Sequence, residues 1–302
     1  MKRQNTDGTP ALPGIRQAYR KHISSLLLFG SNGTVASYIL LNSYEIVFTR
    51  TLIGSLFLIA VFLLSKGKFS GWKNKKHFRY LIVSGVAMGT SGMFLYEAYT
   101  QIGVSIATLT YYCGPLIVMV LSPFIFRERI TAPKILGFFA VLLGIFFVND
   151  KVIVQGGFSW GLLCGVMSAF MYALMVIFNK KATSITGLEN SIYQLSVSFF
   201  TVMIFVLIKQ GITISLAPQN IFPILFLGVV NTGIGCYLYF SSIQKLPAQS
   251  VAICGSLEPL SALIFSALLL QERLTLIQAA GAILILGGTT FAEFFHKPMT
   301  DQ

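Results

Sequence analysis

The chain has 302 residues, of which 55% are hydrophobic and only 11% carry a charged side chain. Soluble globular proteins carry about 25% charged residues, so this composition excludes an ordinary soluble protein and indicates that lipid surrounds most of the chain. The net charge of +12 is not accompanied by a basic stripe interleaved with aromatic residues, so a nucleic-acid partner is not expected. Loops that face the cytoplasm explain the positive charge better.

Ten apolar segments follow one another along the chain, each long enough to cross the hydrocarbon core of a bilayer as a helix. A polar and basic arm, residues 1–21, precedes them, and a short tail, residues 297–302, follows them. The predicted helices are 22–42, 45–65, 79–101, 104–126, 131–149, 158–179, 188–209, 219–242, 246–270 and 275–295.

The distribution of Lys and Arg predicts how these helices are oriented. If the N-terminus lies in the cytoplasm, most of the 22 Lys and Arg residues fall on the cytoplasmic side, including those of the long polar loop 66–79. Cytoplasmic loops are enriched in these residues. We therefore expect a multi-pass protein of the cell (inner) membrane with both termini in the cytoplasm.

An internal repeat is detectable at one constant offset. Pro115 aligns with Pro259, and Glu128 with Glu272. The same offset also pairs Arg129 with Arg273, Gly137 with Gly281 and Gly144 with Gly288. Each half, residues 22–150 and residues 151–296, would hold five helices. Because five is odd, the second half would enter the membrane from the opposite side, as in inverted-repeat transporters with a site at the repeat interface.

These repeated Pro, Glu-Arg and Gly positions resemble the EamA family of the drug/metabolite transporter (DMT) superfamily. The resemblance covers residues 22–295 and implies ten helices around a central cavity, with export or exchange of small metabolites such as amino acids. It does not fix the substrate. One departure between the two copies is that Gly114 aligns with Glu258, so the halves differ chemically near the middle of the membrane.

Glu258 is the strongest candidate site residue. Ionisable residues inside a spanning helix usually face the bundle interior or a water-filled cavity. The adjacent Pro259 lacks an amide hydrogen and disturbs the preceding turn, which can turn backbone carbonyls toward the cavity. Glu258 either binds a cationic group or a coupling proton, or it is a packing residue that shapes the kink.

Further candidates are polar or aromatic residues that the hydropathy pattern places within the membrane. Buried tyrosines need partners for their hydroxyls and could form an aromatic box for an amine, although tyrosines also form interfacial belts and helix contacts. Amides within the membrane are either substrate-facing or bonded between helices. The candidates are Glu97, Tyr99, Tyr111, Tyr112, Tyr172, Tyr237, Asn32 and Asn231. Glu97 could instead reach the interface.

Arg50 and Glu45 are interpreted as interfacial anchors near the outer surface. Pairing of Arg50 with an anionic substrate is the competing interpretation.

Signatures of enzymes and cofactors are missing from the sequence. There is no Walker loop, HExxH, GxSxG or CxxC, so no catalytic residue, metal or cofactor is expected.

The predicted function is a secondary transporter, an exporter or exchanger of small metabolites, that works by alternating access. Amino acids or related amines are the preferred substrate class. A quaternary-amine or multidrug carrier of the same fold is the first alternative, and a membrane enzyme acting on lipid is the second. The oligomeric state and the coupling ion are not predicted.

Overall fold

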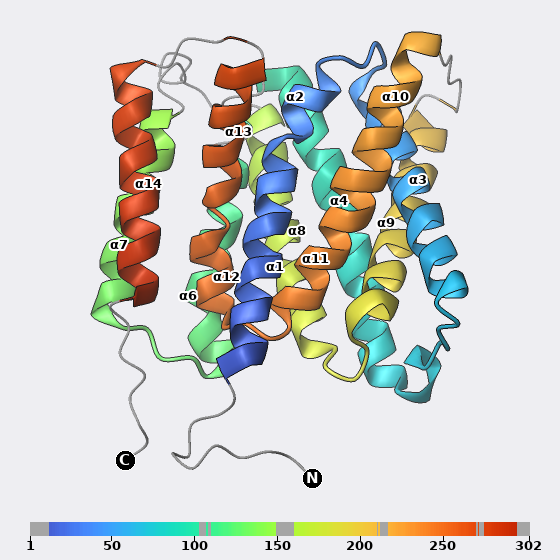
Figure 1. Cartoon of the computed structure of the whole chain (residues 1–302), viewed down its shortest axis with the longest axis horizontal. Coiled ribbons are helices and arrows are strands. Elements are labelled where there is room, and N and C mark those ends of the chain that lie inside the picture. Colours follow the sequence, from blue (N-terminus) through green and yellow to red (C-terminus); the bar gives the residue numbers. More distant parts are fainter. Residues whose placement is uncertain are drawn as a thin grey trace.

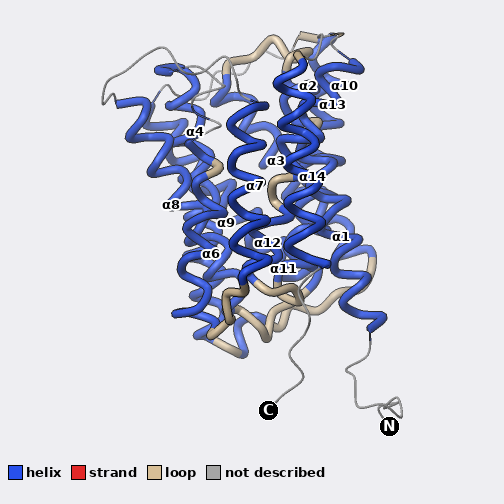
Figure 2. Tube along the Cα trace, turned by 90° about the vertical axis from the view of Figure 1, so that its left-hand side faces the viewer, coloured by secondary structure: helices blue, strands red, loops and turns tan. Residues whose placement is uncertain are grey.

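The structure is a computed structural model. It describes residues 12–102, 107, 110–148, 160–209, 211, 217–269, 271 and 275–294. Within these residues every regular element is a helix and none is a strand, as Figure 2 shows. The all-α prediction is therefore confirmed for the part of the chain that is described. The 297–302 tail and the Glu272-Arg273 pair lie outside it.

The helices run up and down the molecule and their long axes lie side by side (Figure 1). In chain order they are α1 (Leu12–Gly30), α2 (Asn32–Ala36), α3 (Ser43–Leu64), η1 (Gly71–Lys73), α4 (Lys75–Ile102), α6 (Cys113–Phe126), α7 (Ala132–Val148), α8 (Trp160–Lys181), α9 (Gly187–Lys209), α10 (Pro218–Phe226), the π-helix η3 (Leu227–Ile234), α11 (Gly235–Ile243), α12 (Ala248–Cys254), α13 (Leu257–Leu269) and α14 (Leu276–Phe294).

Six helical stretches within the described residues are long and apolar enough to cross a membrane. They are α3, α4, α8, α9, the continuous stretch Pro218–Ile243 and the stretch Ala248–Leu269. Shorter apolar helices are Cys113–Phe126, Ala132–Phe147 and Ala279–Ala292. Large apolar side chains such as Leu64, Phe124 and Leu276 are at least 81% exposed, which a surrounding lipid phase explains.

The first helix departs from its predicted bounds. It begins at Leu12 rather than at residue 22, and it is interrupted at Ser31 before α2 ends at Ala36. The segment assigned to a polar arm is therefore helical from Leu12 on. The pattern is amphipathic: Arg16 and Arg20 are exposed, whereas Ala18 and His22 are buried. Residues 1–11 lie outside the described part.

The largest apolar core fills the half of the molecule in which α1 begins and α14 ends. It unites buried residues of helices far apart in sequence, among them Leu26, Leu58, Val118, Val176 and Ile243. Figure 1 shows α1 and α14 with these ends at the same, lower side. Packed apolar side chains therefore fill that half of the molecule.

Candidate functional site

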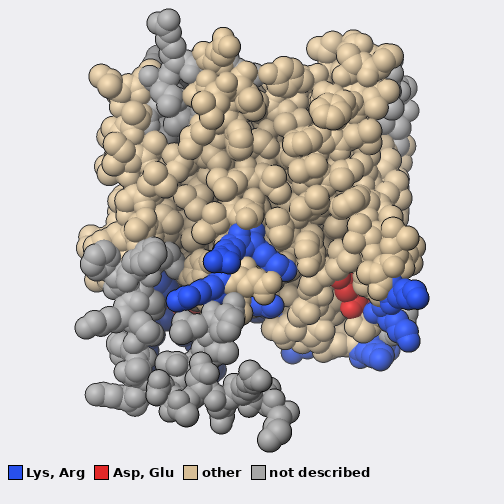
Figure 3. Space-filling model, in the orientation of Figure 1, with Lys and Arg blue, Asp and Glu red and all other residues tan. Residues whose placement is uncertain are grey.

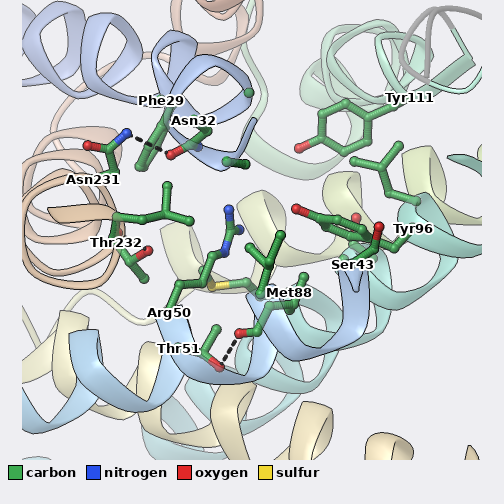
Figure 4. A pocket seen from close by; sticks show the side chains of 18 of the residues that line it. Phe29, Asn32, Ser43, Arg50, Thr51, Met88, Tyr96, Tyr111, Asn231 and Thr232 are labelled. Atoms are coloured by element: carbon green, nitrogen blue, oxygen red, sulfur yellow. Dashed lines mark hydrogen bonds between the residues drawn. The ribbon is translucent and has the colours of Figure 1, made fainter. Parts of the chain in front are cut away.

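A pocket of about 760 Å³ lies among helices from the N-terminal and the C-terminal parts of the chain (Figure 4). Its wall comes from α1, α2, α3, α4, α8, α9, η3, α11 and α13. It extends from the depth of Phe240 and Met175 toward the end at which α3 begins, where Ser43 and Tyr96 line it. A pocket of this size suits a small-molecule ligand.

The pocket is lined where helices are interrupted. Residues beside the α1–α2 break at Ser31 and shortly after the α12–α13 break line it, and the π-helical segment η3 contributes lining residues of its own. In η3 the Thr232 hydroxyl donates to the Leu227 carbonyl at 2.8 Å, five residues back. Interrupted and π-helical segments leave backbone groups or side chains free to face a ligand, and they are frequent at functional sites.

Glu258 lies beside one of these interruptions. It occupies the first turn of α13, and both it and Pro259 line the pocket. The Ser256 N–H donates to the Ile253 carbonyl at 3.2 Å, and the Glu258 N–H donates to the Gly255 carbonyl at 3.1 Å. These tighter turns replace α-helical bonding just before the proline, as expected for a residue that disturbs the preceding turn.

Asn231 ties η3 to the interruption between α1 and α2. Its amide nitrogen donates to the Leu28 carbonyl at 3.0 Å, to the Ser31 hydroxyl at 2.8 Å and to the Asn32 side-chain oxygen at 2.9 Å. Its own side-chain oxygen is buried without a hydrogen-bond partner. Asn32 and Asn231 both line the pocket. The pair therefore bonds between helices and also faces the pocket.

Four of the predicted tyrosines form part of the pocket wall. Tyr111 stands edge-on to Tyr172 with their ring centroids 5.4 Å apart, and its ring lies 5.8 Å from that of Tyr112. The Tyr172 hydroxyl lies 3.0 Å from the hydroxyl of Tyr239, which also lines the pocket. Tyr99 also lines the pocket, from α4.

Two candidates lie outside the pocket wall. Glu97 accepts a hydrogen bond from the Tyr44 hydroxyl and forms an ion pair with Lys209 at 3.3 Å. Tyr237 faces Lys21, whose ammonium group lies 3.4 Å from the hydroxyl and 4.9 Å from the ring centroid. The pocket face of α11 carries Cys236, Tyr239 and Phe240, three residues at helical spacing, and the neighbouring residue 237 is turned about 100° away from it.

Arg50 lines the pocket and is not the interfacial anchor that its place in the sequence suggests. That interpretation is corrected by where α3 begins. The helix starts at Ser43, so Arg50 lies about 10 Å below its start. Glu45 does lie at the end of the helix, where it forms a capping box with Asn42. The sequence feature that could have identified Arg50 as a pocket residue is its charge, which lies about two turns inside a spanning segment.

Groups of three or more His, Cys, Asp or Glu side chains that could hold a metal ion do not occur among the described residues. The four cysteines are unbridged, and Cys164, Cys236 and Cys254 are buried. The pocket chemistry is therefore that of amides, hydroxyls, aromatic rings and two charged side chains.

The model of the EamA-like transporter family matches residues 22–150 and residues 159–293. The chain belongs to the EamA-like transporter family. This family is part of the DMT superfamily, so the resemblance seen in the repeated Pro, Glu-Arg and Gly positions is confirmed. The protein is a membrane-embedded transporter and not an enzyme.

Relatives of the chain are named as transporters. It is 25% identical to the uncharacterized transporter YxxF of Bacillus subtilis, over 89% of this chain and 86% of the relative. It is 24% identical to the uncharacterized inner membrane transporter YhbE of Escherichia coli K12, over 83% of each chain. A probable amino-acid metabolite efflux pump of Escherichia coli K12 is 26% identical over 61% of this chain and 65% of its own length.

A solved crystal structure shares the fold. It superposes with a TM-score of 0.80 over 92% of this chain and 98% of its own, at 15% sequence identity. At that identity the likeness concerns the arrangement of the helices alone.

Proposed function

We propose that this EamA-family transporter moves small metabolites, amino acids or related amines, by alternating access of two inverted halves, residues 22–150 and 151–296. The observation that carries the proposal is a carboxylate, Glu258, at a helix interruption in a pocket between the halves. Ionisable groups at such depth mark substrate or ion pathways, and transporter sites are typically built from discontinuous helices at a repeat interface.

The inverted repeat is supported by how α7 packs on α14. A Cβ atom on Gly137 would lie 2.5 Å from the Gly288 carbonyl oxygen, and one on Gly144 would lie 2.7 Å from that of Gly281. The sequence offset equates Gly137 with Gly281 and Gly144 with Gly288. The contact of Gly137 with Gly288 is thus repeated by the contact of their equivalents, Gly281 with Gly144. Such reciprocal pairs arise when a two-fold axis relates two identical surfaces.

Other helix contacts follow the same exchange. If the halves are equivalent, α1 corresponds to α8, α3 to α9, and α4 to the α10–η3–α11 stretch. In the structure α4 packs along α8, and α1 packs along α11. Helix α3 contacts its counterpart α9 directly. The two successive matches to the family model support the same division of the chain.

Alternating access is supported by the difference between the two ends of the molecule. The pocket extends toward the end at which α3 begins, whereas the opposite end is packed and linked by polar contacts. There the Lys180 ammonium group donates to the carbonyls of Ile243, at 2.9 Å, and of Leu246. In the proposal, transport opens this end and closes the other.

The orientation in the membrane is part of the proposal. On the face shown in Figure 3, Lys and Arg gather at the end where α1 begins, and cytoplasmic ends are enriched in these residues. We place that end and both termini in the cytoplasm.

The names of two relatives support the membrane and the substrate class. The inner membrane is supported by the name of the YhbE relative, and amino-acid substrates are supported by the name of the probable efflux pump. Proton coupling through Glu258 is the simplest form of ion coupling that the pocket offers.

A quaternary-amine or multidrug carrier is the second candidate. It is favoured by the aromatic wall of Tyr111, Tyr112 and Tyr172 beside Glu258, since aromatic rings attract cations that lack hydrogen-bond donors. The lipid-enzyme alternative has no such support, because the relatives are named as transporters.

Counterflow into proteoliposomes tests the proposal. Purified full-length protein is reconstituted into vesicles that are preloaded with one unlabelled solute, and uptake of the same labelled solute is measured for amino acids, amines and quaternary amines. We expect counterflow of at least one amino acid or amine above empty vesicles. Counterflow of quaternary ammonium compounds alone would select the second candidate. If none of these solutes moves, the proposed function is wrong.

A further inference from the structure

Arg50 is a charged group in the pocket whose role the proposed function does not explain. It lines the wall from α3, and Figure 4 shows its guanidinium group pointing into the space between Asn231 on one side and Tyr96 and Tyr111 on the other. Among the described residues that line the pocket, Arg50 and Glu258 are the two charged ones.

The guanidinium group forms no ion pair within the described part of the chain. Its Nε is buried and makes no hydrogen bond. The ion pair found among these residues joins Lys209 to Glu97 and does not involve Arg50. Arg50 as a whole is half-buried, and a charged group at this depth in a membrane protein is normally paired or hydrogen-bonded. The missing partner of Arg50 is therefore expected to arrive with the ligand.

The chemistry of arginine limits what that partner can be. Arginine stays protonated and presents a planar set of N–H donors that matches a carboxylate with two parallel hydrogen bonds. An amine or a quaternary ammonium ligand would leave this group unpaired and would add a second positive charge. Carriers of simple cations gain nothing from an arginine at this depth.

Glu258 supplies the complementary charge. It lies on α13, in the same pocket as Arg50 on α3, and the two groups interact electrostatically without forming an ion pair. Two opposite charges that stay apart in one pocket fit a ligand that carries both signs, with a carboxylate for Arg50 and an ammonium group for Glu258. The aromatic rings that line the same pocket would contact the rest of the ligand.

We propose that Arg50 is the carboxylate-binding residue of the pocket, so that the site selects zwitterionic substrates over amines. This inference rests on the proposed transport function and chooses between its two substrate classes. It assigns a specificity role to a residue that lies far from Glu258 in sequence and in a different half of the chain.

The test compares matched trios of probes on the full-length protein in detergent, with binding read from thermal shift and titration. One trio is phenylalanine, phenethylamine and 3-phenylpropionate, and another is leucine, isopentylamine and 4-methylpentanoate. We expect an amino acid to bind at least tenfold more tightly than its amine. Arg50→Gln should lower the affinity for the amino acid and the acid tenfold or more and leave the amine unchanged. Arg50→Lys, which keeps the charge but not the planar donor set, should give an intermediate affinity.

Arg79→Gln is the matched control, because Arg79 is exposed at the start of α4 and its loss should leave all affinities unchanged. The inference is overturned if amines bind the wild type as tightly as amino acids, if no amino acid binds, or if a folded Arg50→Gln protein keeps the preference. If Arg50→Gln does not fold, the affinities of the wild type for the two trios and those of Arg50→Lys test the inference instead. Counterflow of amines without amino-acid selectivity would overturn the inference and leave the transport function intact.

Discussion

The carboxylate of Glu128 accepts two hydrogen bonds from the backbone at the start of α12, from the N–H of Ala248 at 2.6 Å and from that of Gln249 at 3.1 Å. Glu128 lies in the first segment that the family model matches, residues 22–150, and α12 lies in the second, residues 159–293. The first turn of a helix has unpaired N–H groups and favours negative charge. This contact therefore links the two matched segments at the end of the molecule that we propose to be closed.

Loss of the Glu128 carboxylate should destabilise that closed end. We expect Glu128→Ala to lower the free energy of unfolding by about 1–3 kcal/mol, the usual cost of leaving buried donors unpaired, and Glu128→Gln, which keeps one acceptor oxygen, to lower it less. Thermal unfolding in detergent measures both. In a cysteine-free background, a thiol at the buried Val251 should react faster when Glu128 is absent. Equal reactivity would show that the contact does not hold the end closed.

Replacement of Glu258 by glutamine should reduce transport while leaving the protein folded, because the amide keeps the shape of the side chain and removes its charge. We expect a drop of tenfold or more in counterflow. Glu45→Gln is the matched control: glutamine is also accepted in a capping box, and Glu45 lies at the start of α3. If the two variants transport equally well, Glu258 is a packing residue.

Close packing of α7 on α14 should make Gly137 and Gly288 intolerant of any side chain. A Cβ atom on Gly288 would lie 2.7 Å from the Gly137 carbonyl oxygen, and backbone atoms within two packed helices cannot easily give way. Gly288→Ala should cost about 1–3 kcal/mol of stability by overpacking. The neighbouring Gly287 has open space around it, so Gly287→Ala should be neutral. Thermal unfolding of the two variants side by side decides the point.

Opposite orientation of the halves can be tested by labelling. Cysteines are placed at Arg129 and at Arg273, the latter outside the described residues, and intact cells are treated with a membrane-impermeant thiol reagent. We expect labelling at position 273 in intact cells and at position 129 only after permeabilisation. Labelling of both positions from one side would contradict the inverted repeat and the site derived from it.

The sequence by itself determined the helices and most of their bounds, because a run of apolar residues and the polar residues that end it are local features. It also indicated that Glu258 lies inside the membrane and that the helix is disturbed before Pro259, because a proline alters the turn that precedes it in its own helix. The start of the first helix at Leu12 was not predicted, because residues 12–21 are amphipathic rather than continuously apolar. Hydropathy alone does not detect such a segment.

Only the tertiary structure decided which polar side chains share the pocket. Arg50 and Tyr239 line it, whereas Glu97 pairs with Lys209 and Tyr237 faces Lys21. Each of these residues lies in an apolar helix at a depth compatible with a pocket, so composition and depth do not separate them. What separates them is the rotation of each helix about its own axis, and that rotation is fixed by packing against neighbours distant in the sequence.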